Sequence, residues 1–212
     1  MRCKRIPFAA SPTALAASAA TIFFAAGLLV ANTAPKTSQE YAFEVYREKG
    51  EGLTVLLDAY PASLHASDPD IPIPIAIGFD GPAGPVRLDD ESFELIGPDG
   101  SASPVAGFTD VLRGYPKRTF DQSLLRARPM AIGSQFSTSR RVASRFFPAP
   151  GRGTRIATVE LAPFTWFHDV LYFPMPAGGL GGTLTLRVKA AGLPKPLDVR
   201  FRIPEQPARF GE

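Results

Sequence analysis

Two stretches near the C-terminal end of the chain alternate apolar and polar residues with a period of two. In residues 183–189, Leu184, Leu186 and Val188 alternate with polar or charged residues, and residues 197–203 repeat the pattern. Successive side chains of a β-strand point to opposite faces, so this pattern predicts strands with one buried and one solvated face. Such strands are typical of antiparallel sheets. The core is therefore expected to be built from sheets.

Short runs of strand-forming residues recur along the chain from about residue 41. The 22 prolines and 19 glycines are spread between these runs, which indicates many short elements joined by turns. The expected strands are Ala42–Arg47, Leu53–Tyr60, Ile71–Phe79, Ser92–Ile96, Arg155–Leu161, Trp166–Phe173, Thr183–Lys189 and Leu197–Ile203. Regularly spaced short strands without a long periodic helix predict an all-β fold, an antiparallel β-sandwich that is broadly immunoglobulin-like.

The stretch Ile71–Phe79 reads IPIPIAIGF, and its isoleucines would share one buried face with Phe79. Pro72 and Pro74 lack N–H groups, and amides two residues apart point to the same neighbouring strand. One side of this strand would therefore have few donors for pairing. We predict an edge strand that resists pairing with other chains.

Basic residues followed by a long uncharged run mark the N-terminus. Arg2, Lys4 and Arg5 precede an apolar run at residues 13–31, a pattern that predicts export of everything after it. Residues 1–37 would be either a cleaved signal peptide or a retained transmembrane helix, since a run of about 20 apolar residues can span a bilayer. The remaining chain is expected to be extracytoplasmic, either periplasmic or secreted, or anchored to the inner membrane by residues 13–31.

After this segment, residues 38–204 are long and apolar enough for a single β-sandwich domain, followed by a C-terminal tail at residues 205–212. Residues 109–147 interrupt the strand pattern. We expect one or two short helices over residues 109–128 and a loop over residues 132–141. The segment has too few apolar residues for a core of its own, so we interpret it as a long insertion within the sandwich.

The net charge argues against a nucleic-acid partner. The chain carries 23 basic and 20 acidic residues, and Arg2, Lys4 and Arg5 account for the whole formal excess of +3. An exported domain without net charge is a poor candidate for binding nucleic acid.

The only cysteine, Cys3, also lies in the N-terminal segment. The exported part therefore has no cysteine for a disulfide, a nucleophile or a thiolate metal site.

Opposite charges are separated along the chain. Residues 38–100 carry thirteen acids against three bases, whereas residues 111–155 carry ten bases against Asp121 alone. The basic segment predicts a surface for an anionic lipid, lipopolysaccharide, a glycan or an acidic envelope protein. The alternative is that the two segments pair with each other in the fold, which their nearly equal charges favour. Candidate residues of the surface are Arg118, Arg126, Arg128, Arg140, Arg141 and Arg145.

The segment LHASDPD at residues 64–70 places His65, Asp68 and Asp70 close together. These groups suit an acid–base pair or a metal ligand set, but their spacing matches no known metal motif and Asp-Pro is a common turn former. No nucleophile motif and no phosphate-binding loop occurs between a strand and a helix. We therefore expect no cofactor and no metal.

The stretch PFTWFHDVLYFPMP at residues 163–176 contains the only tryptophan and a histidine beside an aspartate. As a strand, it would place His168 and Asp169 on opposite faces, where they cannot pair directly. Both faces are mostly apolar, so we favour a central strand covered on its outer face by the insertion. The alternative is a turn before a shorter strand, which would leave His168 free to reach solvent.

These observations predict an exported, non-catalytic β-sandwich protein with a binding or structural role at the cell envelope. One alternative is a basic module that docks on an anionic lipid, lipopolysaccharide or glycan through residues 111–155. A second alternative is a hydrolase with dispersed carboxylates, which one sequence cannot reveal because such residues converge only in space.

Overall fold

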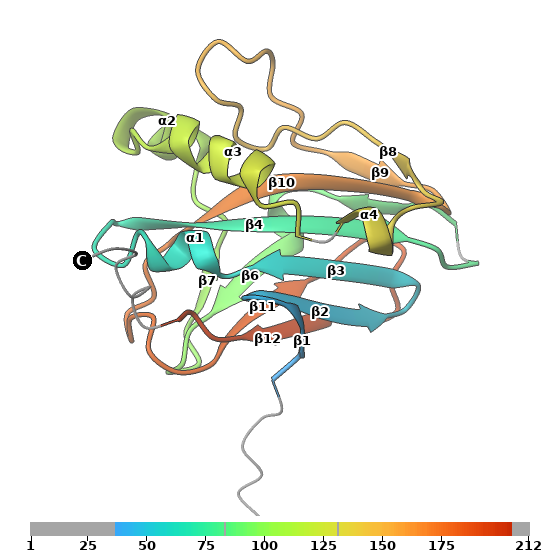
Figure 1. Ribbon diagram of the computed structural model, residues 1–212, viewed down its shortest axis with the longest axis horizontal. Helices are drawn as coiled ribbons and strands as arrows, with labels where there is room; N and C mark the ends of the chain where they lie inside the picture. The colour runs from blue at the N-terminus through green and yellow to red at the C-terminus, as the bar shows by residue number, and fades with distance from the viewer. Residues whose placement is uncertain (1–36, 83, 131, 205–212) are drawn as a thin grey trace, which may run out of the picture. The chain divides into compact units, whose positions relative to one another are not determined.

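A six-stranded sheet forms the centre of the protein. It is seen in a computed structural model that describes residues 37–82, 84–130 and 132–204. All its strands pair antiparallel except the last two, β10 and β8, which are parallel (Figure 1). In spatial order the strands are β1 (Gln39–Ala42), β2 (Val45–Gly50), β3 (Leu53–Asp58), β4 (Asp70–Phe79), β10 (Thr165–Pro174) and β8 (Arg140–Arg141).

A second, four-stranded sheet lies behind the first in the view of Figure 1. Its order is β12 (Leu197–Phe201), β11 (Leu184–Val188), β6 (Phe93–Ile96) and β7 (Ala102–Pro104), and β5 (Val86–Leu88) pairs separately with β9 (Val159–Leu161). Rings connect the layers: Phe146 lies 5.9 Å from Phe93 in the second sheet and 6.0 Å from Phe167 in β10. The protein is thus mostly β, consistent with the predicted sandwich.

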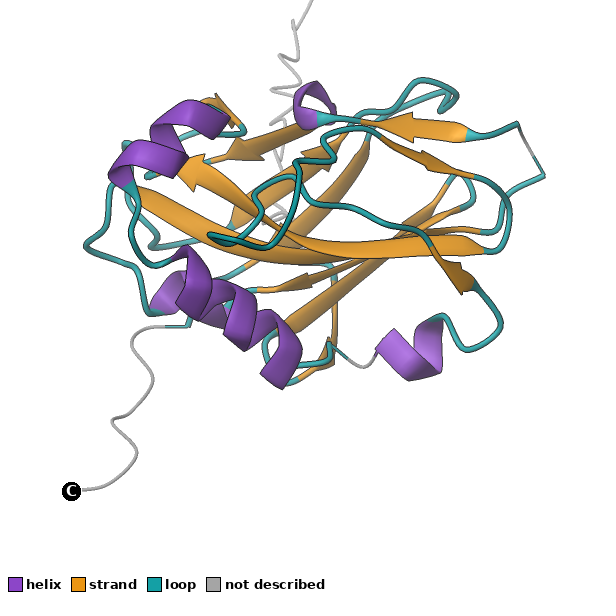
Figure 2. Ribbon diagram, turned by 90° about the horizontal axis from the view of Figure 1, so that it is seen from above, coloured by secondary structure: helices purple, strands orange, loops and turns teal. Residues whose placement is uncertain are grey.

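Short helices occupy the connections. They are α1 (Tyr60–Ser63), the 3₁₀ turn η1 (Asp90–Ser92), α2 (Phe108–Gly114), α3 (Arg118–Ala127) and α4 (Ile132–Gln135). Figure 2 shows α3 and α4 on one side of the sheets. Within the described ranges, no helix is long and apolar enough to cross a membrane. Of the predicted targeting segment at residues 1–37, residues 1–36 lie outside the described residues, as does the predicted tail at residues 205–212.

The alternating strands have the burial that their sequences predict. In β11, Leu184, Leu186 and Val188 are buried, while the residues between them are partly exposed. The same alternation holds along β12. In these strands the period of two therefore identifies the core face correctly.

The prediction of an edge strand at Ile71–Phe79 is wrong, because β4 lies between β3 and β10. The Phe79 carbonyl accepts a hydrogen bond from Phe164 beside β10, and the next amide, Asp80, donates to Gly52 beside β3. Because backbone groups alternate in direction, even-numbered amides of β4 face β3. Strand β3 pairs only with residues 75–79, so Pro72 and Pro74 lie beyond its end and interrupt no ladder.

Several predicted boundaries also need correction. The range Ala42–Arg47 is not one strand, because a tight hairpin at Phe43 and Glu44 divides it between β1 and β2, with Glu44 at a φ of 62°. The strand predicted at Arg155–Leu161 is only the three residues of β9.

In the insertion, where one or two helices are expected over residues 109–128, the structure has two, α2 and α3, but the expected loop contains α4 and β8. Side-chain packing fixes α4 on the outer face of the large sheet. Phe136 follows α4, fits against Gly78, where a Cβ atom would lie only 2.2 Å from the ring, and stacks on Trp166. A glycine facing an aromatic ring across a sheet gives no periodic pattern, so the sequence did not reveal this contact.

Candidate functional site

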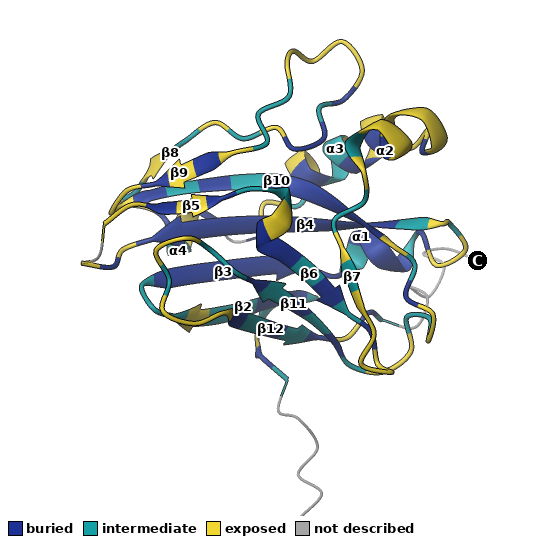
Figure 3. Cartoon of the chain, turned by 180° about the vertical axis from the view of Figure 1, so that it is seen from behind, coloured by how far each residue is buried: buried dark blue, intermediate teal, exposed yellow. Residues whose placement is uncertain are grey.

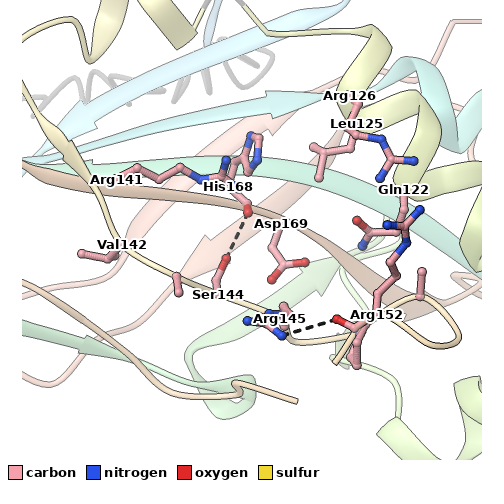
Figure 4. A pocket seen from close by; sticks show the side chains of 13 residues that line it. Gln122, Leu125, Arg126, Arg141, Val142, Ser144, Arg145, Arg152, His168 and Asp169 are labelled. Carbon is pink, nitrogen blue, oxygen red and sulfur yellow. Dashed lines mark hydrogen bonds between the residues drawn. The ribbon is translucent and has the colours of Figure 1, made fainter. Parts of the chain in front are cut away.

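A cleft of about 560 Å³ lies where the insertion crosses the free edge of β10. One wall is α3, and the other is residues 142–152, which we call the strap. Figure 4 shows Arg126 and Arg152 at one end of the cleft and Arg141 at the other. The lining residues are Gln122, Leu125, Arg126, Arg141, Val142, Ala143, Ser144, Arg145, Pro148, Ala149, Arg152, His168 and Asp169.

Hydrogen bonds to the edge of β10 shape the cleft. Val142 donates its N–H to the Trp166 carbonyl at 2.8 Å, after which regular pairing stops. The next outward carbonyl of β10, that of His168, accepts instead from the Ser144 hydroxyl at 3.0 Å. A side chain thus replaces the backbone ladder, and the strap moves away from the strand. Space opens between the strap, β10 and α3.

Four arginines line this cleft, namely Arg126, Arg141, Arg145 and Arg152. The structure shows no ion pair for any of them among the residues it describes. The Arg145 guanidinium donates to the Arg152 carbonyl at 3.4 Å, and the Arg141 guanidinium lies 5.7 Å from the centre of the Trp166 ring. Asp169 is the one acidic residue of the lining and is buried, so four guanidinium groups around one concavity create a positive potential that attracts anions.

Asp169 lies at the base of the cleft and is only 3% exposed. Its carboxylate accepts hydrogen bonds from the N–H groups of Phe146 at 3.0 Å and Val170 at 2.9 Å. Burial raises the pKa of Asp169, and these hydrogen bonds act in the opposite direction. The hydrogen bond from Phe146 holds the strap on β10, whereas the one from Val170 lies within β10 and orients the carboxylate.

His168 and Asp169 do not form a dyad. Their side chains lie on opposite sides of the β10 ribbon, as the predicted strand requires (Figure 4). Burial, with a smaller contribution from the charge of Arg141, lowers the pKa of His168 to about 4. The imidazole is therefore neutral at pH 7 and adds no positive charge to the cleft. The alternative of a turn at His168 is wrong, because β10 is a continuous strand.

The six predicted arginines do not form one surface. Arg126, Arg141 and Arg145 line the cleft, and Arg140 is exposed next to Arg141 on β8. Arg118 is instead buried, where it donates to the backbone carbonyls of Leu112, Tyr115 and Pro148. Arg128 pairs with Asp58 at 2.8 Å and with Glu44 at 3.4 Å.

The opposite charges of the two chain segments pair in part. Besides Arg128, Lys117 pairs with Asp68 at 2.7 Å and Arg155 pairs with Asp90. These contacts neutralise one group of bases and leave the cleft arginines without acidic partners among the described residues.

Sequence reasoning did not single out Arg152, Gln122 or Ser144. Arg152 was part of the basic run, but the other two gave no signal because ordinary polar residues become site residues only through the fold.

His65 lies at the centre of a buried polar cluster, 1% exposed. Its Nδ1 lies 2.6 Å from Asp68 and 3.1 Å from the Tyr115 hydroxyl. Its Nε2 lies 3.0 Å from an oxygen of the fully buried Asp121, although without the alignment of a hydrogen bond. The other oxygen of Asp121 accepts a hydrogen bond from Tyr172 at 3.0 Å. This cluster ties α3 and the end of α1 to β10.

The predicted grouping of His65, Asp68 and Asp70 is thus only partly formed. Asp70 begins β4 and forms no hydrogen bond or ion pair with the other two among the described residues, and burial raises its pKa. The described residues hold no group of three or more histidine, cysteine or acidic side chains that suits a metal. His65 and Asp121 are sealed from solvent, so they offer a substrate no access. The cluster has the features of a structural network.

The His65 cluster predicts that stability decreases at alkaline pH. Burial acts to lower the pKa of His65, but the nearby carboxylates of Asp121 and Asp68 outweigh it, so the folded-state pKa is raised above 6.5. The stabilisation is fully present below pH 6.5 and is lost as pH rises through the folded-state pKa. Each unit of difference corresponds to about 1.4 kcal/mol.

Urea unfolding between pH 6.5 and 9 measures this effect. His168 acts in the opposite direction near pH 6.5, where only the unfolded state loses a proton from it, but both proteins contain His168 and its contribution cancels in their comparison. The His65→Gln variant should have a flatter pH profile than the wild-type protein. Equal slopes for the two proteins would contradict this role of His65.

No protein-family model matches the chain, and neither a curated protein nor a solved structure matches it. The arginine cleft therefore has to be interpreted from its own chemistry.

Proposed function

We propose that this chain is an exported, non-catalytic, broadly immunoglobulin-like β-sandwich protein that binds an anionic envelope molecule in its arginine cleft. Export is supported by the basic and apolar residues of the N-terminal segment at residues 1–37. The partner would carry phosphate, sulfate or carboxylate groups, as anionic lipids, lipopolysaccharide, acidic glycans and acidic envelope proteins do. The proposed location is extracytoplasmic.

One observation carries this proposal: four guanidinium groups line one cleft without a carboxylate partner among the described residues. Elsewhere the same chain segment places its bases against acids, as Arg128 and Arg155 show. Holding like charges together lowers stability unless another interaction compensates. Guanidinium groups match the planar, bidentate geometry of phosphate and carboxylate. An anionic partner would therefore supply the missing counter-charge.

The polar groups near the cleft favour binding over catalysis. The Asp169 oxygens accept backbone hydrogen bonds, and the Ser144 hydroxyl donates to the His168 carbonyl. Among the described residues, no basic side chain accepts a hydrogen bond from Ser144, as the activation of a nucleophile would need. The hydrolase alternative receives no support from His65 and Asp68, because His65 is buried and Asp68 is paired with Lys117.

The test measures binding of the full-length protein to heparin, used as a soluble polyanion, by isothermal titration calorimetry. The double variant Arg126→Gln/Arg152→Gln should bind at least about tenfold more weakly, since about 1.4 kcal/mol corresponds to a factor of ten. Affinity of the wild-type protein should also fall with increasing salt.

A control with the same loss of charge is Arg113→Gln/Lys49→Gln, since both residues are exposed and lie outside the cleft. Its affinity should change by less than about twofold at physiological salt, because screening limits the contribution of distant charges. If both double variants lose affinity equally, only net charge matters and the cleft is not the site.

A further inference from the structure

Phe164 is an unusually placed aromatic residue in the turn between β9 and β10. Its side chain is 61% exposed, and the preceding Ala162 and Pro163 are exposed as well. Thr165 stabilises this turn, since its N–H and its hydroxyl both donate to the Ala162 carbonyl. The turn thus presents a short apolar tip to solvent.

The backbone conformation of Phe164 is also unfavourable for a large side chain. Its φ is +59°, a left-handed conformation in which a bulky side chain is strained and glycine or asparagine is favoured. The backbone is well bonded, because the N–H of Phe164 donates to the Phe79 carbonyl at 2.7 Å. The turn therefore depends on the backbone conformation of this residue, whereas the exposed ring does not pack into the core.

Exposed arginines connect this tip to the cleft. Arg140 donates its N–H to the Phe164 carbonyl at 2.8 Å, and Arg141 follows it on β8. Both arginines are exposed, and β8 is coloured accordingly in Figure 3. Arg141 also lines the cleft and lies over Trp166. Asp80, at the end of β4, is an acidic residue near the same tip. We call the surface of Phe164, Arg140, Arg141 and Trp166 the basic aromatic edge.

We propose that the basic aromatic edge contacts an anionic membrane, with the Phe164 ring in the head-group layer and Arg140 and Arg141 on lipid phosphates. This inference rests on the proposed function and assigns its partner to the lipid class. An acidic glycan would be enclosed by a concave cleft, whereas Phe164 projects from a convex turn. A projecting ring can be buried by entering a deformable head-group layer, and aromatic rings beside basic residues are favoured at the bilayer interface. Anionic lipid adds attraction for each arginine near the surface.

Trp166 is the only tryptophan of the chain and lies within this edge, so its fluorescence reports the contact directly. The experiment places the full-length protein in vesicles of brominated phosphatidylcholine, with or without about one third phosphatidylglycerol. Bromine quenches tryptophan at short range, which makes the signal independent of attachment through the N-terminal segment. We expect at least twofold stronger quenching in the anionic vesicles, and the difference should disappear at high salt.

Phe164→Asn should abolish this difference while leaving thermal stability equal or higher, because asparagine tolerates the left-handed backbone. The matched control is Phe43→Asn, which removes another exposed ring beside β1, the opposite edge of the same sheet, and should leave quenching unchanged.

Equal quenching of the wild-type protein and the Phe164 variant overturns the proposal, as does quenching that is the same in neutral and anionic vesicles. If heparin binding requires Arg126 and Arg152 but vesicles never quench Trp166, the cleft binds a soluble polyanion and only the membrane contact is wrong. If both measurements fail, the proposed function fails as well.

Discussion

Replacing Asp121 with alanine is expected to lower the free energy of unfolding by about 3–5 kcal/mol, the usual cost of removing one partner from a buried charge pair. Asp121 is fully buried and faces His65 with one oxygen, while the other accepts a hydrogen bond from Tyr172. Truncation would leave a buried imidazole with less counter-charge and a buried phenol without its acceptor. Both groups would then carry an uncompensated desolvation cost.

Urea unfolding at pH 6 measures this loss, because His65 is largely protonated there and the charge interaction is fully present. The exposed Asp80→Ala variant should change stability by less than about 0.5 kcal/mol. Asp121→Asn retains an acceptor for Tyr172 but not the charge, so we expect an intermediate loss. An Asp121→Ala protein as stable as the Asp80 variant would show that the cluster contributes nothing.

The cluster and the cleft share one element, α3. Asp121 connects this helix to His65 and Tyr172, and the neighbouring Gln122 and Arg126 face the cleft. The buried network therefore holds one wall of the proposed binding site in place. A charged wall positioned by a rigid buried contact loses less conformational entropy on binding than a mobile one.

The sequence predicted the parts of the fold that depend on local periodicity. The alternation around His168 correctly predicted a strand and separated that ring from Asp169, which adjacency alone would have paired. The two prolines of β4 led to the wrong prediction of an edge strand. Their missing N–H groups disrupt pairing only if the neighbouring strand extends as far as the prolines. Strand β3 ends its pairing at Ile75, and no pattern within β4 reports that length.

The candidate site was predictable only as a region. Counting charge identified residues 111–155 as basic, but Arg118 and Arg126 occupy one helix and have opposite fates. Arg118 is buried among backbone carbonyls, whereas Arg126 lines the cleft. Which arginine meets a carboxylate depends on tertiary contacts such as that of Arg128 with Asp58, seventy positions away. Composition carries no information on such distant pairs.

Replacing Phe146 with alanine should cost about 3–5 kcal/mol of stability, as for other large buried aromatic side chains. The ring is fully buried between Phe93 of the second sheet and Phe167 of β10, so truncation leaves a cavity between the layers. The strap should also lose its position, because the N–H of Phe146 donates to Asp169. Two separate properties, stability and anion binding, therefore depend on one side chain.

Urea unfolding and heparin titration, both performed at a temperature where the variant remains folded, measure the two effects. The matched control is Phe43→Ala, whose ring is 73% exposed and should contribute less than about 0.5 kcal/mol. Phe146→Leu keeps most of the apolar volume and should lie between the two in stability. Folded Phe146→Ala protein should bind heparin more weakly than wild-type, because Arg145 precedes the truncated residue and Arg152 follows it on the same strap. Unchanged affinity in a destabilised but folded variant would mean that the cleft keeps its shape without this ring, and that Asp169 alone positions the strap.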